Sequence, residues 1–370
     1  MPSLPRYGMT DSRPARAGAL RAFLQLEGID ALLVTHLPNI RWLTGFSGSA
    51  ALLVVSQKAL TLITDFRYAT QAPQEAGSAA EVVIDRRSVW DRLARVLASQ
   101  APATLGVEAT VMTIREAERV SAATVARVVP IADSVERLRQ VKDAGEVASI
   151  RAAGTLALDA LAEVLPTVRV GDRELDVAAR LEAALRRRGS EWHPFPTIVA
   201  SGPRAALPHA GTSERIIQRG EFLLLDFGAQ LDGYCADITR TVVVGASADE
   251  RQRTVYELVE EAQRRAREGV RAGMTGSEAD GLAREVIAAR GYGEAFGHSL
   301  GHGLGLEVHE APRLAPTAEA LLPVGAVVTV EPGIYLPGWG GVRLEDDVWL
   351  SASGPVLLTD GRTELIELDS

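Results

Sequence analysis

The sequence contains very little cysteine, and its apolar residues form only short runs. Cys235 is the single cysteine among 370 residues, which excludes an intrachain disulfide bond and is typical of proteins from a reducing compartment. The longest apolar runs, such as residues 50–55, have the length of a strand and fall short of the roughly 20 residues that a membrane-spanning helix requires. Residues 1–16 also lack the apolar core of a signal peptide. We therefore expect a cytoplasmic protein without a membrane role.

An excess of positive charge is also absent. The formal net charge is −9, and Lys58 and Lys142 are the only lysines, so nearly all basic residues are arginine. A chain with this charge would on balance repel a phosphate backbone, which argues against nucleic acid as a partner. The preference for arginine is compatible with thermostabilising ion pairs, but genomic base composition explains it equally well, and we prefer that explanation.

Apolar residues make up 46% of the sequence, so a large core can be buried, and a chain of 370 residues is expected to form two domains. In residues 14–135, short apolar runs alternate with amphipathic stretches such as 89–97. The runs lie at residues 31–35, 49–56, 60–65, 81–85 and 104–108. This alternation predicts an α/β domain. It contains no clustered ligand set and no phosphate-binding glycine loop, so we interpret it as a scaffold or a cap over the substrate.

Residues 136–370 are predicted to form a second, α+β domain, and the charged stretch 135–143 marks the boundary. Its helices are expected at residues 146–165, 174–188, 248–268 and 277–290. Residues 171–186 and 275–290 align at an offset of 104 with six identities in sixteen positions, which suggests a duplicated unit. A twofold arrangement of the two units would place a site between them.

Two acidic residues flank a predicted hairpin turn in this second domain. Asp226 closes the apolar run at residues 222–225, Asp237 lies eleven positions further on, and the turn is expected at residues 231–233. A tight hairpin would bring the two carboxylates together, where they would repel each other unless cations neutralise them. The alternative is a carboxylate pair bound by arginines such as Arg240, and for the pair in isolation the two interpretations are even.

Three of the six histidines lie close together in residues 297–310, among four glycines. They are His298, His302 and His309. A lone histidine is more often a surface or core group than a ligand, but this grouping favours function, because glycines allow backbone and ligands to approach closely.

Two glutamates further along complete the candidate set. Glu331 follows the apolar run at residues 327–330, and Glu345 follows Arg343, with which we expect it to share a strand face. The acids at residues 346–347 are interpreted as solvated. Buried carboxylates need partners, and oxygen-rich ligands with one imidazole suit Mn²⁺, Co²⁺ or Zn²⁺. Five residues could together hold two divalent ions, and such an ion pair is typical of hydrolytic enzymes. They are Asp226, Asp237, His302, Glu331 and Glu345.

With these residues assembled, the chain resembles the proline-specific pita-bread metallopeptidases, aminopeptidase P and prolidase. The segments that carry the resemblance are IVASGPRAALPHA, LLLDFGAQLDGYCADITRT, FGHSLGHGLGLEVHE, VVTVEPGIY and GVRLEDD, in family order. The segment NIRWLTGFSGSAALLVV is typical of the accessory domain. The resemblance implies a creatinase/prolidase-like accessory domain in residues 14–135 and a pita-bread catalytic domain with a pseudo-twofold repeat in residues 136–370.

The resemblance also implies roles for individual residues. The five residues above would bind the two metal ions, with Asp237 and Glu345 bridging them. His309 would donate to the developing charge or to the scissile amide, with His298 nearby. His209, in a loop after a predicted strand, would contact the substrate around the proline, although local sequence alone favours an ordinary loop histidine. Arg343 would meet a dipeptide carboxylate or the backbone of a longer peptide.

One segment departs from the family pattern. Residues 192–196 contain two prolines and His193, which we interpret as a surface-loop residue rather than an extra substrate contact. The departure falls near the expected entrance of the substrate pocket.

We predict an Xaa-Pro aminopeptidase that releases the N-terminal residue from peptides with proline second, because no insertion visibly closes the far side of the cleft. The alternatives are an Xaa-Pro dipeptidase (prolidase) and, in another class, a non-catalytic pita-bread binding module, which would have lost metal ligands. Glu331 is expected to accept a proton from a metal-activated water. Two divalent ions per subunit are expected, manganese first, with zinc or cobalt as alternatives. The resemblance further implies a homodimer.

Overall fold

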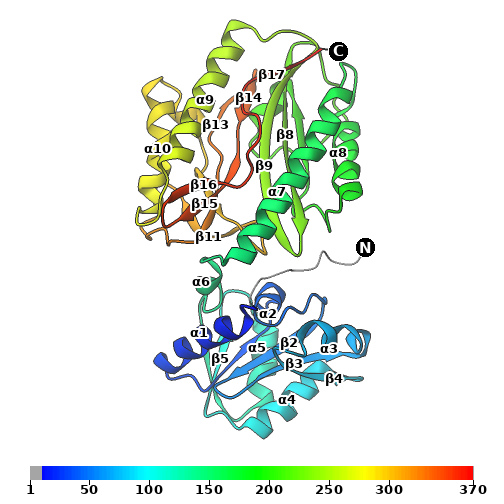
Figure 1. The fold of residues 1–370 in the computed structure, drawn as a ribbon, viewed down its shortest axis with the longest axis vertical. Coiled ribbons are helices and arrows are strands. Elements are labelled where there is room, and N and C mark those ends of the chain that lie inside the picture. The colour runs from blue at the N-terminus through cyan, green and yellow to red at the C-terminus, as the bar shows by residue number, and fades with distance from the viewer. Residues whose placement is uncertain (1–10, 370) are drawn as a thin grey trace. The chain divides into compact units, whose positions relative to one another are not determined.

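The computed structural model describes residues 11–369, which divide between Arg139 and Gln140 into two compact units (Figure 1). The boundary expected from the sequence lay between residues 135 and 136. The described part of the first unit runs from residue 11 to Arg139, and that of the second from Gln140 to residue 369.

The first unit is the predicted α/β domain. Its strands are β1 (Ala31–Val34), β2 (Ala51–Ser56), β3 (Leu60–Asp65), β4 (Glu81–Asp85), β5 (Thr104–Glu108) and β6 (Arg127–Ile131). Its helices are α1 (Arg13–Leu26), α2 (Leu37–Thr44), η1 (Phe66–Tyr68), α3 (Gln71–Ala76), α4 (Val89–Gln100), α5 (Ile114–Ala123) and α6 (Glu136–Arg139). The strand β6 and the helix α2 were not anticipated.

The strands of the first unit form one six-stranded mixed sheet in the order β4-β3-β2-β1-β5-β6. Alternate residues of its central strands, such as Leu33, Val54 and Val107, join Leu93 and Leu97 of α4 in one core. Leu93 and Leu97 are four positions apart and therefore lie on one face of the helix. The apolar runs thus form strands of the sheet, and the amphipathic stretch 89–97 forms a helix that packs on it, as predicted.

The second unit contains four long helices and eleven strands among its described residues. The helices are α7 (Ala144–Val164), η2 (Leu165–Thr167), α8 (Glu174–Arg188), η3 (Gly202–Ala206), α9 (Glu250–Gly269), α10 (Gly276–Ala289) and η4 (Gly293–Ala295). The strands are β7 (Ile198–Ser201), β8 (Glu221–Leu231), β9 (Tyr234–Val244), β10 (Gly301–Gly303), β11 (Glu310–Leu314), β12 (Val327–Val330), β13 (Gly333–Leu336), β14 (Gly340–Arg343), β15 (Asp346–Ser351), β16 (Gly354–Leu357) and β17 (Ile366–Leu368).

These elements form two similar halves, with the strands between the helix pair α7–α8 and the helix pair α9–α10 (Figure 1). One half holds the sheet β17-β9-β8-β7, and the other holds the sheet β11-β10-β12-β15-β16 with the small sheet β13-β14. The two repeated sequence segments fall on α8 and α10. The α+β domain with its internal repeat is therefore confirmed.

Strand periodicity decides which side chains of β8 and β9 face inward. Leu223, Leu225 and Phe227 of β8 pack with α7 and α8 in one core. Because successive side chains alternate between the two faces of a sheet, Asp226 points to the opposite face. The same alternation in β9 places Asp237 away from the helices. The apolar face thus anchors the sheet to the helices and leaves the acids on the other side.

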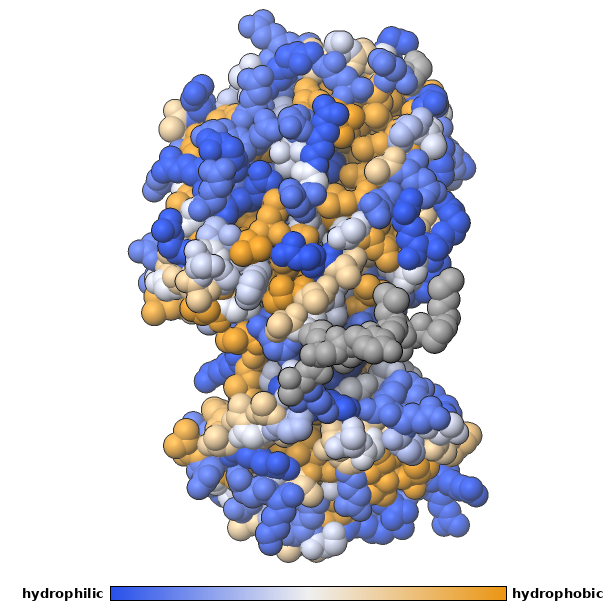
Figure 2. Space-filling model, viewed as in Figure 1, coloured by the Kyte–Doolittle hydropathy of each residue, from blue (hydrophilic) through white to orange (hydrophobic). Residues whose placement is uncertain are grey.

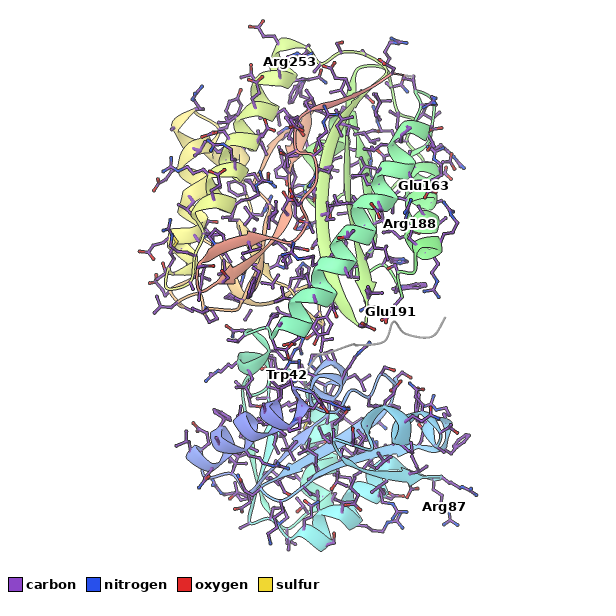
Figure 3. The ribbon with its side chains drawn as sticks, in the orientation of Figure 1. Trp42, Arg87, Glu163, Arg188, Glu191 and Arg253 are labelled. Atoms are coloured by element: carbon purple, nitrogen blue, oxygen red, sulfur yellow. The ribbon has the colours of Figure 1, made fainter. Side chains whose placement is uncertain are left out.

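The helix boundaries have local causes. Asp143 caps α7 by accepting hydrogen bonds from the backbone of Gly145 and Glu146, and Gly189 ends α8 with a left-handed φ of 109°. Figure 3 shows Glu163 on α7 close to Arg188 on α8, and their Oε2 and Nη2 atoms are 2.9 Å apart. This exposed ion pair adds little stability, so the apolar faces hold the two helices together.

On the side seen in Figure 2, the surface of the second unit carries both hydrophilic residues and sizeable apolar areas between them. Within residues 11–369, no helix combines the length and the apolar character needed to cross a bilayer.

Candidate metal centre and active site

The predicted hairpin is present, and it sets the first two acids side by side. The strands β8 and β9 are antiparallel partners joined by Asp232 and Gly233, which have φ values of 51° and 81°. Positive φ at both positions is the signature of a tight two-residue turn. Asp226 pairs with Thr239, and Asp237 pairs with Gly228. The two carboxylates are therefore diagonal neighbours on one face of the hairpin.

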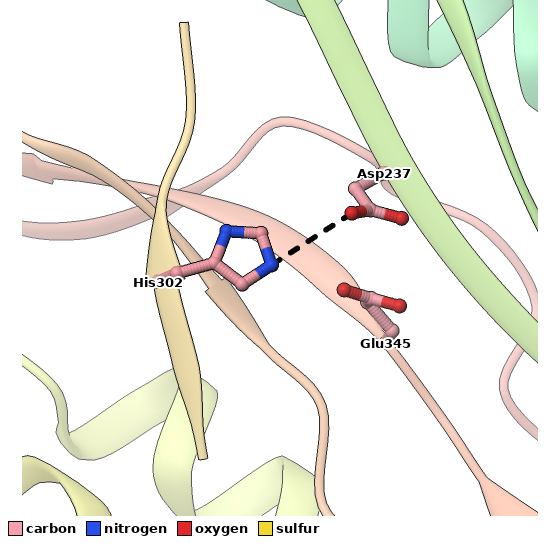
Figure 4. A group of neighbouring side chains, drawn as sticks. All are labelled: Asp237, His302 and Glu345. Atoms are coloured by element: carbon pink, nitrogen blue, oxygen red, sulfur yellow. Dashed lines mark ion pairs between the residues drawn. The ribbon is translucent and has the colours of Figure 1, made fainter. Parts of the chain in front are cut away.

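The ends of strands from the other half supply the remaining candidates. His302 lies in β10, Glu331 directly follows β12, and Glu345 lies between β14 and β15, where it forms an isolated bridge with Thr239. Ligand atoms of Asp237, His302 and Glu345 all lie within 4.8 Å of one another (Figure 4). His302 Nε2 is 3.9 Å from Asp237 Oδ2 and 3.5 Å from Glu331 Oε1.

Neighbouring groups orient these side chains. His302 Nδ1 lies 3.0 Å from the carbonyl oxygen of Gly303. A carbonyl only accepts, so Nδ1 carries the proton and Nε2 is left with the lone pair that a metal would need. Thr239 Oγ1 donates to Glu345 Oε2 at 2.7 Å. A Cβ added to Gly301 would lie 2.0 Å from the carbonyl oxygen of Thr329, so only glycine permits β10 to approach β12 so closely.

The clustered charges shift the pKa values of these groups. Burial, followed by the charges of Glu345 and Asp226, raises the pKa of Asp237 well above its usual value. Burial and neighbouring carboxylates likewise raise the pKa of Glu331, and they raise the pKa of Glu345 to about 8. Burial lowers the pKa of His302 to about 4. The carboxylates therefore oppose one another's ionisation, while the imidazole is neutral.

This arrangement fits divalent cations. Among the described residues, the buried Oδ1 atom of Asp237 has no hydrogen-bond partner. A buried polar atom left unpaired is costly, and a bound cation would both pair it and neutralise the surrounding carboxylates. Carboxylate oxygens with a single imidazole nitrogen match borderline ions such as Mn²⁺, Co²⁺ and Zn²⁺.

Arg343 is buried beside the site and is occupied by protein acceptors. Its Nη2 atom is 2.5 Å from Asp226 Oδ2, and its Nη1 atom donates to Tyr335 Oη at 2.8 Å and to the Pro208 carbonyl at 3.1 Å. Its Nε atom donates to Thr239 Oγ1 at 3.1 Å. Four of the five N–H groups of a guanidinium are thus engaged within the protein. The geometry gives Arg343 a structural task, holding Asp226, beside its expected contact with substrate.

The histidines expected near the substrate line one side of the centre. The His298 ring bonds through Nε2 to Tyr335 Oη at 2.8 Å, and its Nδ1 atom is 4.0 Å from Glu331 Oε2. The ring centroids of His302 and His309 are 4.4 Å apart. Burial lowers the pKa of His298 to about 4 and also lowers the pKa of His309, and the charge of His209 lowers both pKa values further. The structure therefore gathers these histidines, and His209 itself is exposed.

Some expectations about neighbouring residues were wrong. Residues 346–347 are fully buried rather than solvated, because they lie where β15 packs beneath the site. Asp347 Oδ2 accepts the backbone N–H of Asp237 at 3.2 Å. Arg240 binds Asp346 and neither acid of the hairpin. Glu345 does not share a strand with Arg343, since β14 ends at Arg343.

Other neighbours either matched the prediction or were missed. His193 is half-buried and stacks on the exposed Trp192 with ring centroids 4.4 Å apart. Sequence reasoning missed Thr239 and Tyr335. The strand alternation around Asp237 carried the signal for Thr239, which lies two positions further on, and Tyr335 belongs to the same short motif as Glu331. The contact of Tyr335 with His298 has no local signal.

Family comparisons define the class of the protein. Residues 148–352 match the model of metallopeptidase family M24, and residues 16–141 match the creatinase/prolidase N-terminal domain. The chain belongs to metallopeptidase family M24 and is a hydrolase, which removes the non-catalytic binding module from consideration.

Individual relatives match over nearly their whole length. An Xaa-Pro dipeptidase of Pyrococcus horikoshii is 36% identical over 346 residues, which cover 93% of this chain and 96% of the relative. A solved Xaa-Pro dipeptidase from Bacillus anthracis is 40% identical, with a TM-score of 0.93, and covers 96% of this chain and 100% of its own. A solved X-Pro aminopeptidase from Thermotoga maritima is 39% identical, with a TM-score of 0.88, and covers 93% and 99%.

Proposed function

We propose that the protein is an Xaa-Pro dipeptidase, which cleaves the bond between any first residue and a proline that carries the free carboxylate. The gathering of Asp237, His302 and Glu345 around one point, with Asp226 and Glu331 beside them, is the observation that carries a metallopeptidase function. Two of the three relatives described above are named Xaa-Pro dipeptidases, and this favours the dipeptidase over the aminopeptidase that the sequence alone suggested.

The second candidate is an Xaa-Pro aminopeptidase. The solved X-Pro aminopeptidase of Thermotoga maritima supports it, because its identity of 39% is almost that of the solved dipeptidase. The two activities share the scissile bond and differ only in whether the chain continues beyond the proline. Xaa-Pro hydrolysis is therefore common to both candidates, and only the requirement for a free proline carboxylate distinguishes them.

The five clustered residues are proposed to hold two divalent ions, and the resemblance implies that Asp237 and Glu345 would contact both. When bound, two such cations acidify a water molecule and polarise a carbonyl group. The oxygen-rich donor set supports manganese first, with zinc or cobalt as alternatives.

Glu331 is the proposed general base. Its side chain is only 16% exposed, and its two oxygens lie 3.5 Å from His302 Nε2 and 4.0 Å from His298 Nδ1. Burial raises its pKa well above the usual value, so the carboxylate binds a proton more readily than an exposed glutamate does. It is thereby suited to take a proton from the attacking water and to pass it to the leaving nitrogen.

The histidines provide the proposed substrate contacts. His309 lies in edge-to-face contact with His302 and its side chain is exposed, which suits a hydrogen bond to the developing oxyanion or to the scissile amide. His298 is held by Tyr335, so its ring forms a fixed wall. His209 is exposed and is proposed to contact the substrate around the proline. Arg343 is proposed to bind the carboxylate of that proline.

Two further properties are part of the proposal. The single cysteine supports a cytoplasmic location, because it is what a reducing compartment favours. A homodimer is proposed from the family resemblance, and sedimentation analysis would test it.

The decisive experiment compares an Xaa-Pro dipeptide with a matched Xaa-Pro-Xaa tripeptide on the Mn²⁺-loaded protein, with the released N-terminal amino acid followed by chromatography. We expect cleavage of the dipeptide and little cleavage of the tripeptide. Equal or faster tripeptide cleavage would establish the aminopeptidase instead, and failure on both peptides with Mn²⁺, Co²⁺ and Zn²⁺ would refute Xaa-Pro hydrolysis. Glu331→Ala should abolish turnover and retain the fold.

A further inference from the structure

His209 lies on a loop whose two ends are held by one buried side chain. The loop runs from Gly202 to residue 212, between β7 and the residues that lead into β8. The first residue of α8, Glu174, is completely buried between the two ends of this loop. A fully buried carboxylate is costly unless it is hydrogen-bonded and paired, so its partners indicate what it does.

Glu174 accepts five hydrogen bonds from three residues of this region. Its Oε1 atom accepts the backbone N–H and the hydroxyl of Ser201, at 2.8 and 2.9 Å. Its Oε2 atom accepts the backbone N–H and the hydroxyl of Ser213, at 3.1 and 2.6 Å. Arg204 Nε donates to Oε2 at 3.1 Å and supplies the opposite charge. Oε1 therefore binds the residue before the loop, whereas Oε2 binds the residue after it together with Arg204.

The middle of the loop is braced against the metal centre. The carbonyl oxygen of Pro208 accepts a hydrogen bond from Arg343, the arginine that holds Asp226. A Cβ added to Gly341 would lie 2.2 Å from the carbonyl oxygen of Ala205, so η3 packs directly on the backbone of β14. With the ends held by Glu174 and the middle resting on β14, His209 has a restricted range of positions relative to the centre.

We propose that Glu174 is a positioning residue, which acts through His209 by clamping the two ends of its loop. The proposal rests on the proposed function, because it requires His209 to contact the Xaa-Pro substrate. Glu174 itself does not touch substrate in this account. Its loss should weaken substrate binding and leave the chemical step at the metals largely unchanged.

Glu174→Gln tests the clamp with almost no change in size. An amide has one acceptor oxygen and one NH₂ group that only donates. The hydroxyls of Ser201 and Ser213 can rotate and accept, but their backbone N–H groups cannot. Whichever way the amide is turned, the backbone N–H of either Ser201 or Ser213 loses its acceptor, so one end of the loop is released.

The expected result is a rise of about tenfold in KM for the dipeptide with little change in kcat, since one lost buried hydrogen bond corresponds to roughly that factor. His209→Ala should show the same rise, and the double variant should show no further rise, because both changes remove one contact. The matched control is Glu278→Gln. Glu278 occupies the equivalent place in the repeat, at α10, where it is exposed and caps only its own helix. The kinetic constants of this control should equal those of the wild type.

Several results would overturn the proposal. These are a wild-type KM in Glu174→Gln, additive effects in the double variant, or a loss confined to kcat. If Glu174→Gln does not fold, Arg204→Ala replaces it, because Arg204 is partly exposed and also donates to the carbonyl of Gly211. It should raise KM in the same way and have no effect in the His209→Ala background. An inactive wild-type protein would refute the proposed function instead, so the two failures are distinguishable.

Discussion

Replacing Asp346 by asparagine should destabilise the second unit by about 3–5 kcal/mol, because a buried charge pair would lose one partner. Asp346 is completely buried. Its Oδ1 atom accepts from Arg240 Nη2 at 2.7 Å, and its Oδ2 atom accepts from Arg267 Nη1 at 3.0 Å. The side chain of Arg240 is only 3% exposed, so water cannot replace the lost counter-charge. In either orientation, the new NH₂ group would also face the N–H groups of one of the two arginines.

The assay is thermal unfolding together with hydrogen exchange in β15. For a unit of this size, about 3–5 kcal/mol lowers Tm by roughly 6–20 °C, and amides of β15 should exchange faster. Asp360→Asn is the control, because Asp360 is exposed, and such changes stay within about 0.5 kcal/mol. A loss below about 1 kcal/mol for Asp346→Asn would refute the reasoning, since it would mean that the two arginines keep adequate partners.

The same variant should weaken metal binding. Arg240 Nη1 donates to the backbone carbonyl of Glu345 at 2.6 Å, so Asp346 orients a proposed ligand through Arg240. Loss of such a supporting contact typically lowers metal affinity about 10–100-fold. Titration of the metal-free variant with Mn²⁺ by calorimetry would measure this. An unchanged affinity would show that Arg240 keeps its place without its counter-ion.

Three further predictions concern other parts of the second unit. Saturating Mn²⁺, at about 100 times Kd, should stabilise the metal-free protein by about 2.7 kcal/mol in a thermal melt, and Asp237→Asn should largely remove this response. Cys235 is buried, and burial raises the pKa of its thiol, so iodoacetamide at pH 8 should label it only after unfolding; rapid labelling of the native protein would contradict this. Gly341→Ala should cost about 1–3 kcal/mol and raise KM, because its Cβ would meet the Ala205 carbonyl. Gly211→Ala, which has open space, should cost much less.

Much of the architecture follows from local patterns in the sequence. The short apolar runs predicted five of the six strands of the first unit, and the helical pattern predicted α8 at its observed bounds, 174–188. The pair Asp232–Gly233 predicted the hairpin that sets Asp226 beside Asp237. These features depend on side chains a few positions apart, and a single sequence contains such information directly. The resemblance to a known family then ordered the ligand candidates, and the family comparisons confirmed the class.

Other features were decided by tertiary structure alone. The sequence predicted that Asp346 and Asp347 are exposed to solvent, yet both are buried, because β15 packs beneath the site. Glu174 lies in a helix with many charged neighbours, and nothing local distinguishes it from an exposed glutamate such as Glu278. Thr239 meets Glu345 only because β9 and the start of β15 come together. Burial and partnership between distant segments depend on how the sheets and helices pack, and the spacing of residues along the chain does not encode that packing.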